Sequence, residues 1–105
     1  MKLVIITSSM AFQKDIKSML KKVDVKTYSF REVTGYTDFS DTATVENWFA
    51  SENNEIESIL FYAFVKKENV DQLFDLITEF NTVQESQSNI HIAVLNIEKS
   101  NNPTI

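Results

Sequence analysis

The chain has 105 residues, of which 43% are hydrophobic, and it contains no cysteine. This length can bury one core but not two, so we expect a single domain over residues 1–105. The absence of cysteine excludes disulfides, thiolate catalysis and sulfur-ligated metal centres. A net charge of −5 disfavours polyanionic partners, so we expect no nucleic-acid partner. The apolar run at the N-terminus is too short for a signal peptide or a membrane span, which predicts a cytoplasmic protein with no direct membrane insertion.

The apolar pattern predicts the first four elements in chain order. Leu3–Ile6 is a short β-rich run, and Ser9 is a candidate N-cap for a helix whose apolar residues recur at helical spacing from Phe12 to Val23. β-Branched and aromatic residues predict a long strand over Val25–Gly35, which ends at the only glycine. Glu57–Val65 is apolar at both odd and even positions, as in a central strand that is covered on each side.

Two further elements complete the pattern. Asn69 and Gln72 have the spacing of a capping box at the start of an apolar-striped helix, and Ile90–Ile97 supplies a last strand. The order βαββαβ predicts an α+β, ferredoxin-like fold with a four-stranded antiparallel sheet and two helices on one face. Two helices cover only one side of such a sheet, so the apolar second face predicts association of copies through that face.

Four segments resemble the PII signalling proteins, in the same order along the chain. They are the opening Met1–Ile5, the strand end Val33-Thr34-Gly35-Tyr36, the helix segment Val70–Ile77 and the last strand His91–Glu98. The resemblance implies a trimeric, non-enzymatic regulatory protein that acts in signal transduction through protein–protein contacts. It also implies a long loop over residues 36–55 that meets partner proteins, and nucleotide clefts between subunits.

The resemblance further implies a ligand site with altered chemistry. The glycine-rich turn that holds ATP phosphates in the family falls on Ser88-Asn89-Ile90-His91, where no glycine remains and a largely neutral histidine replaces a lysine. The family's two arginines after the last strand fall on Asn102 and Thr104. We therefore expect weak or no ATP binding and no required cofactor, and a less charged adenine compound such as AMP is a candidate ligand. The positions of the implied site are Ser29, Gly35, Tyr36, Thr37, Asn89, His91 and Lys99.

The predicted loop over residues 36–55 contains five acidic residues and no Lys or Arg. This charge favours a basic protein partner, and a membrane-transport protein is a second possibility. Trp48 and Phe49 lie at helical spacing after Val45, either as a small satellite core or as anchors for a partner. The candidate partner-binding residues are Asp38, Asp41, Glu46, Trp48 and Phe49.

Other functions have weaker support in the sequence. His91 is the only histidine, and neither a P-loop nor a nucleophile motif occurs, so we expect neither a metal site nor an enzyme. CutA-type trimers, which associate with divalent metals, share the topology and are the nearest alternative. A second alternative is an RNA-recognition domain, because Tyr62-Ala63-Phe64-Val65 resembles the core of its aromatic RNA-binding motif. That motif's basic residue and glycine are missing here, so we interpret these aromatics as sheet core.

Overall fold

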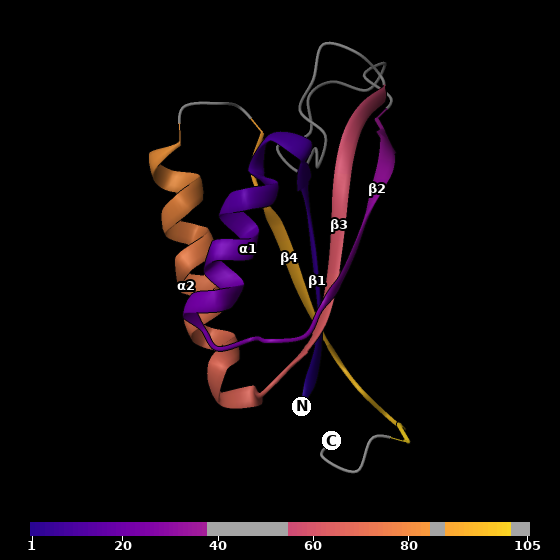
Figure 1. Ribbon diagram of the computed structural model, residues 1–105, viewed down its shortest axis with the longest axis vertical. Coiled ribbons are helices and arrows are strands. Elements are labelled where there is room, and N and C mark those ends of the chain that lie inside the picture. Colours follow the sequence, from indigo (N-terminus) through magenta and orange to yellow (C-terminus); the bar gives the residue numbers. More distant parts are fainter. Residues whose placement is uncertain (38–54, 85–87, 102–105) are drawn as a thin grey trace.

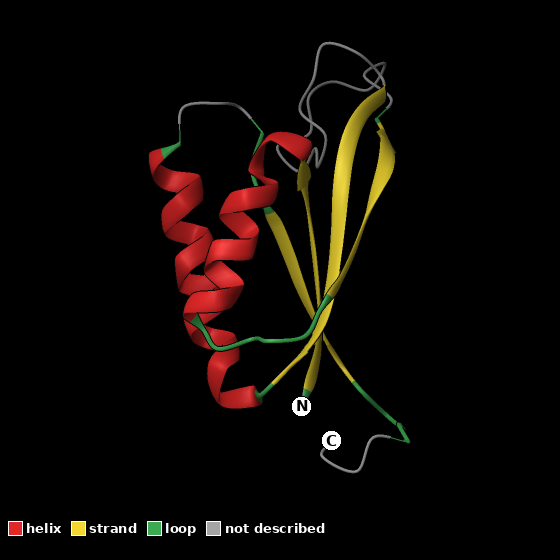
Figure 2. Cartoon of the chain, viewed as in Figure 1, coloured by secondary structure: helices red, strands yellow, loops and turns green. Residues whose placement is uncertain are grey.

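The computed structural model describes residues 1–37, 55–84 and 88–101. Their elements are β1 (Lys2–Ser9), the 3₁₀ turn η1 (Met10–Phe12), α1 (Gln13–Lys22), β2 (Ser29–Tyr36), β3 (Glu55–Val65), α2 (Lys67–Val83) and β4 (His91–Asn96). The strands form one antiparallel sheet in the order β2-β3-β1-β4. Both helices pack on the same side of this sheet (Figure 1, Figure 2). The predicted α+β ferredoxin-like fold is therefore confirmed.

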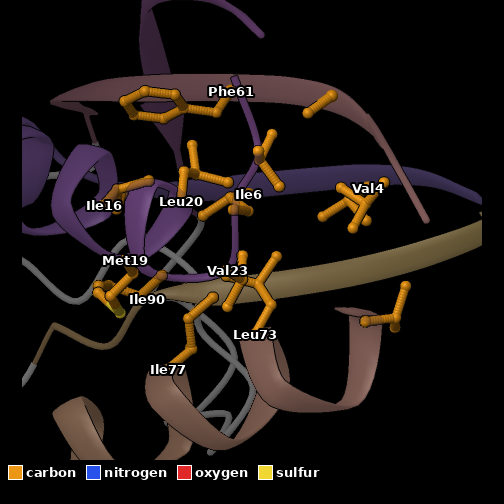
Figure 3. Close-up of a cluster of buried hydrophobic side chains, with 14 of the residues drawn as sticks. Val4, Ile6, Ile16, Met19, Leu20, Val23, Phe61, Leu73, Ile77 and Ile90 are labelled. Atoms are coloured by element: carbon orange, nitrogen blue, oxygen red, sulfur yellow. The ribbon is translucent and has the colours of Figure 1, made fainter. Parts of the chain in front are cut away.

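The core lies between the helices and one face of the sheet. Alternate residues of β1 and β3 point toward the helices, and the side chain of Phe61 is only 1% exposed. Leu20 of α1 and Leu73 of α2 are fully buried against this face (Figure 3). Burying each such side chain contributes about 1.5–3 kcal/mol, so the helical faces and the strand alternation stabilise each other.

The strand β2 begins later than the sequence pattern predicts. The predicted start at Val25 is wrong, because the backbone N–H of Val25 donates to the Leu20 carbonyl, at 2.9 Å, at the end of α1. Asp24 adopts the left-handed conformation, with φ of 61°, which turns the chain away from the helix. Val25 is thus a buried core residue in the segment that connects α1 to β2. The pairing of β2 with β3 starts only at Ser29.

The helix α2 begins earlier than predicted. Its N-cap residue is Lys66, which has extended backbone angles, and the N–H of Asn69 already donates to the Lys66 carbonyl at 2.9 Å. The capping box predicted at Asn69 and Gln72 is therefore wrong. The predicted cap at Ser9 is confirmed in a modified form, because its hydroxyl accepts the Ala11 N–H at 3.2 Å and caps η1, from which α1 continues.

Candidate functional site

The segment between α2 and β4 contains Ser88, Asn89 and Ile90, the positions where the sequence resemblance implies a phosphate-binding turn. The side chain of Asn81 binds both backbone groups of Ile90, the residue before β4. Its amide nitrogen donates to the Ile90 carbonyl and its amide oxygen accepts the Ile90 N–H, each at 2.8 Å. The amide of Gln84 donates to the Ser88 carbonyl at 2.8 Å and to the Asn89 side chain at 3.0 Å. The Ile90 N–H is therefore already occupied and does not offer a hydrogen bond to a phosphate.

Sequence reasoning missed Asn81 and Gln84 as the residues that shape this turn. Both lie at the end of α2, and their side-chain amides bind groups of the segment that follows the helix. No periodic signal in the sequence marks these contacts, because the partners lie four to nine residues further along the chain.

The predicted ligand residues fall into two groups at opposite ends of the sheet. The first group comes from two segments: Gly35 and Tyr36 end β2, with Thr37 after them, and Asn89 and His91 are at the start of β4. These two segments share one end of the sheet, but β3 and β1 separate their strands. A single chain therefore does not bring them into one site.

The other two predicted ligand residues lie toward the opposite end of the sheet. Ser29 is the first residue of β2 and pairs with Tyr62 of β3. Lys99 lies three residues beyond Asn96, where β4 ends, and lines a groove with Met1 and Glu98. Within one chain, both residues lie away from the first group.

His91 faces the side of the sheet opposite to the helices. It pairs with Thr7 of β1, which is 6% exposed. Partial burial lowers the pKa of the imidazole below its usual value of 6.5, because desolvation penalises the charged form. The hydroxyl of Thr7 is buried without a hydrogen-bond partner among the described residues. The partial burial of His91 therefore favours the neutral form of its imidazole.

The face of the sheet that the helices leave uncovered carries exposed large apolar side chains, and we call it the open face. Cross-strand partners share a face, so the pairings place residues of β3, β1 and β4 together on it. Tyr62 and Phe64 are each 45% exposed, and Leu95 is 42% exposed. The apolar residues of the open face are Leu3, Ile5, Leu60, Tyr62, Phe64, Ala93 and Leu95.

The predicted apolar second face is confirmed by these exposures. The interpretation of Tyr62 and Phe64 as core is wrong for the single chain, because both rings lie on the side without helices. Their alternation with the buried Phe61 and Ala63 follows directly from the two-residue period of a strand.

Other predicted features lie outside the described residues. They include the candidate partner-binding residues Asp38, Asp41, Glu46, Trp48 and Phe49. In the described ranges, no group of three or more His, Asp or Glu side chains is placed to hold a metal ion. The helices described here are also too short or too polar to cross a membrane.

Comparison with known proteins gives structural matches only, since neither a protein-family model nor a curated protein matches the sequence. The chain is similar to CPII, a nitrogen regulatory PII-like protein from Thiomonas intermedia K12 solved with ADP, AMP and bicarbonate. The TM-score is 0.61 at 16% identity, over 94% of this chain and 93% of that chain. The apo form of CPII matches with a TM-score of 0.61 at 18% identity, over 89% of this chain and 84% of that one.

A DUF3240 family protein from Shewanella baltica OS155 gives a TM-score of 0.66 at 11% identity, over 96% of this chain and 93% of that chain. Matches of this extent show that the chain shares its overall fold with these proteins. The similarity to PII proteins that the sequence suggests therefore extends to the whole arrangement of strands and helices.

Proposed function

We propose that this chain is a PII-like regulatory protein of the cytoplasm: a single non-enzymatic domain that forms a homotrimer through its open face. The observation that carries the proposal is the open face itself. Tyr62, Phe64 and Leu95 are each more than 40% exposed there. Large apolar patches on the surface of a folded domain usually mark an interface. The PII-like fold of the structural neighbours supports a regulatory role for the assembly.

Light scattering after gel filtration tests the assembly directly. A trimer has three times the 12.1 kDa mass of the chain. A particle with the mass of one chain at micromolar concentration would contradict the proposal. The same experiment with added RNA tests the alternative use of Tyr62 and Phe64, because base stacking needs these rings free of other subunits.

The proposed ligand is an adenine compound with little negative charge, which binds between subunits. The end of β2 in one subunit, with Gly35, Tyr36 and Thr37, would face the start of β4 in the next. Support comes from the Ile90 N–H, which already donates to Asn81, and from the neutral imidazole of His91. Neither group compensates the negative charge of a triphosphate. CPII, which shares the fold, was solved with ADP and AMP.

Calorimetry with AMP, ADP and ATP tests this ligand preference. We expect AMP to bind more tightly than ATP, and ATP binding tighter than about 10 μM would contradict the weakened phosphate site. The variant His91→Lys restores a positive charge at this position. It should increase ATP affinity relative to wild type while leaving AMP affinity nearly unchanged.

The proposed contact with a protein partner uses residues 36–55. Their five acidic residues without a basic one favour a partner with a basic surface, and Trp48 offers an aromatic anchor. The variant Trp48→Ala separates the two interpretations of this residue. Loss of partner binding at unchanged thermal stability identifies an anchor, whereas a drop of several degrees in the melting temperature identifies a core residue.

A further inference from the structure

The basic residues of the chain are concentrated in one short segment. Residues 14–26 contain five of the ten basic residues but only two of the 15 acidic residues, Asp15 and Asp24. That segment therefore has a net charge of +3, from five minus two, and the rest of the chain has −8, from five minus 13. The lysines of this segment are Lys14, Lys17, Lys21, Lys22 and Lys26.

Helix stability explains only part of this concentration. Lys21 and Lys22 lie in the last turn of α1, where positive charge interacts favourably with the helix dipole. Lys14 lies near the start of α1, where the dipole disfavours it, and Lys17 lies between them. Like charges three or four residues apart also destabilise a helix. Over the described residues one ion pair forms, between Lys26 and Asp24 at 3.8 Å, so Lys17 and Lys21 are not neutralised there.

Three of these lysines surround a groove between α1 and the connection to β2, which we call the lysine groove. Lys17 and Lys21 line it from the helix, and Lys26 lines it from the connection. Its other walls are the polar Ser18, the carboxylate of Asp24, the buried Val25 and the half-buried Tyr28. Three lysines against one carboxylate leave the rim with a net positive charge, and Val25 and Tyr28 give the groove an apolar floor.

An aromatic contact fixes one side of the lysine groove. The ammonium of Lys17 lies 4.3 Å from the centre of the Phe30 ring, which itself stacks on Phe61 of the core. Tyr28 packs against the same core ring at 5.7 Å. The rim and the floor are therefore attached to the rigid part of the fold, so less side-chain freedom is lost when a ligand binds.

The surroundings of the groove restrict which anion fits it. The neighbouring helix α2 has four exposed acidic residues, at positions 68, 71, 75 and 79 (Figure 1). Outside residues 14–26 the chain carries a net charge of −8, so a broad polyanion such as a duplex nucleic acid or an anionic membrane would also meet repulsive charge. A narrow polypeptide segment can contact the lysines alone, and an apolar side chain on it would meet Val25 and Tyr28.

We infer that the lysine groove binds an acidic polypeptide segment that carries an apolar or aromatic side chain. Its carboxylates contact Lys17, Lys21 and Lys26, and its apolar side chain lies on Val25 and Tyr28. This surface is on the helix side of the sheet, opposite to the open face (Figure 2). It stays accessible when copies associate through the open face, and the inference does not depend on that association.

Fluorescence anisotropy with a labelled peptide tests this inference on the full chain. The probe is a short peptide of glutamates with one central tryptophan. We expect saturable binding that weakens as salt rises, and about fivefold to tenfold weaker binding for the double variant Lys17→Gln/Lys21→Gln, as two exposed charge contacts predict. The matched control is Lys66→Gln/Lys67→Gln, which removes the same charge from exposed lysines outside the groove and should bind like wild type.

Three results would overturn the inference. They are no saturable binding of the peptide, equal loss in the two double variants, and tighter binding of a 20-base-pair DNA duplex or of phosphatidylserine vesicles than of the peptide. Circular dichroism shows whether each variant is folded. If Lys17→Gln/Lys21→Gln does not fold, the single variant Lys26→Gln outside the helix gives the same test, with an expected loss of about twofold to fivefold.

Discussion

The two faces of β3 have similar side chains but different surroundings. Phe61 and Val65 point toward the helices and are each 1% exposed, whereas Tyr62 and Phe64 point to the other side and are each 45% exposed. Residues 59–65 of β3 are all apolar, and a stretch of strand that is apolar on both faces needs a cover on each of them. The helices supply one cover, and we propose that other copies of the chain supply the second.

The largest expected effect is on assembly. Phe64→Lys places a charge among the apolar residues of the proposed interface, and burying it without a partner is strongly unfavourable. We expect the mass measured by light scattering to fall to that of one chain, with an unchanged circular dichroism spectrum. Val83→Lys is the control, because Val83 is 69% exposed at the end of α2 and should tolerate the same change. Retention of the trimer by Phe64→Lys would argue against the open face as the interface.

The next effect compares two leucines on opposite sides of the sheet: Leu73 of α2 lies in the core, and Leu95 of β4 lies on the open face. Leu73→Ala leaves a cavity in the core and should lower the free energy of unfolding by about 2–5 kcal/mol. Leu95→Ala removes the same atoms from a side chain that is 42% exposed, so it should cost much less. Urea denaturation of both changes in the Phe64→Lys background measures the folding of the single chain. Equal losses would mean that the two faces do not differ as described.

A smaller effect is expected at the start of β4. Asn81→Ala removes two hydrogen bonds to Ile90, whose carbonyl and N–H then lack their partner, so stability should fall by about 1–3 kcal/mol. Thr82→Ala removes a hydroxyl on the exposed side of α2 that only donates to the Thr78 carbonyl, and it serves as the control. If both variants denature at the same urea concentration, the amide of Asn81 does not hold the turn.

The smallest effect concerns pH. Burial lowers the pKa of His91 in the folded state below 6.5, so the unfolded chain binds the proton more readily. The stability contributed by neutral His91 is fully present above about pH 6.5 and is lost as pH falls through the lower folded pKa. His91→Asn should therefore lose less stability than wild type between about pH 7 and pH 5, measured by thermal denaturation. Identical pH profiles for the two proteins would contradict this assignment.

The sequence predicts the fold well where hydrophobic periodicity dominates. The alternation in β3 and the stripes of α1 and α2 each bury a continuous face, so the order of elements along the chain and the uncovered face follow from them. The predicted starts of β2 and α2 are wrong because local hydrogen bonds decide them. The Val25 N–H belongs to the end of α1, and Lys66 precedes the first turn of α2.

The candidate site is less predictable from the sequence. The residues that the PII resemblance implies come from both edge strands, with β3 and β1 between them, so no pattern within one chain shows whether they meet. The role of Asn81 depends on a contact nine residues away, between a helix end and a strand start. Contacts of this kind depend on tertiary packing, which periodicity does not describe.

Hydroxyl-radical footprinting of the wild-type protein tests the central claim most directly. Phe30 and Phe64 are chemically identical and have nearly equal exposure in the single chain, 43% and 45%, but Phe30 packs on the helix side and Phe64 lies on the open face. If copies cover the open face, Phe30 is modified readily and Phe64 is protected. Equal modification of the two rings at micromolar concentration would contradict the account.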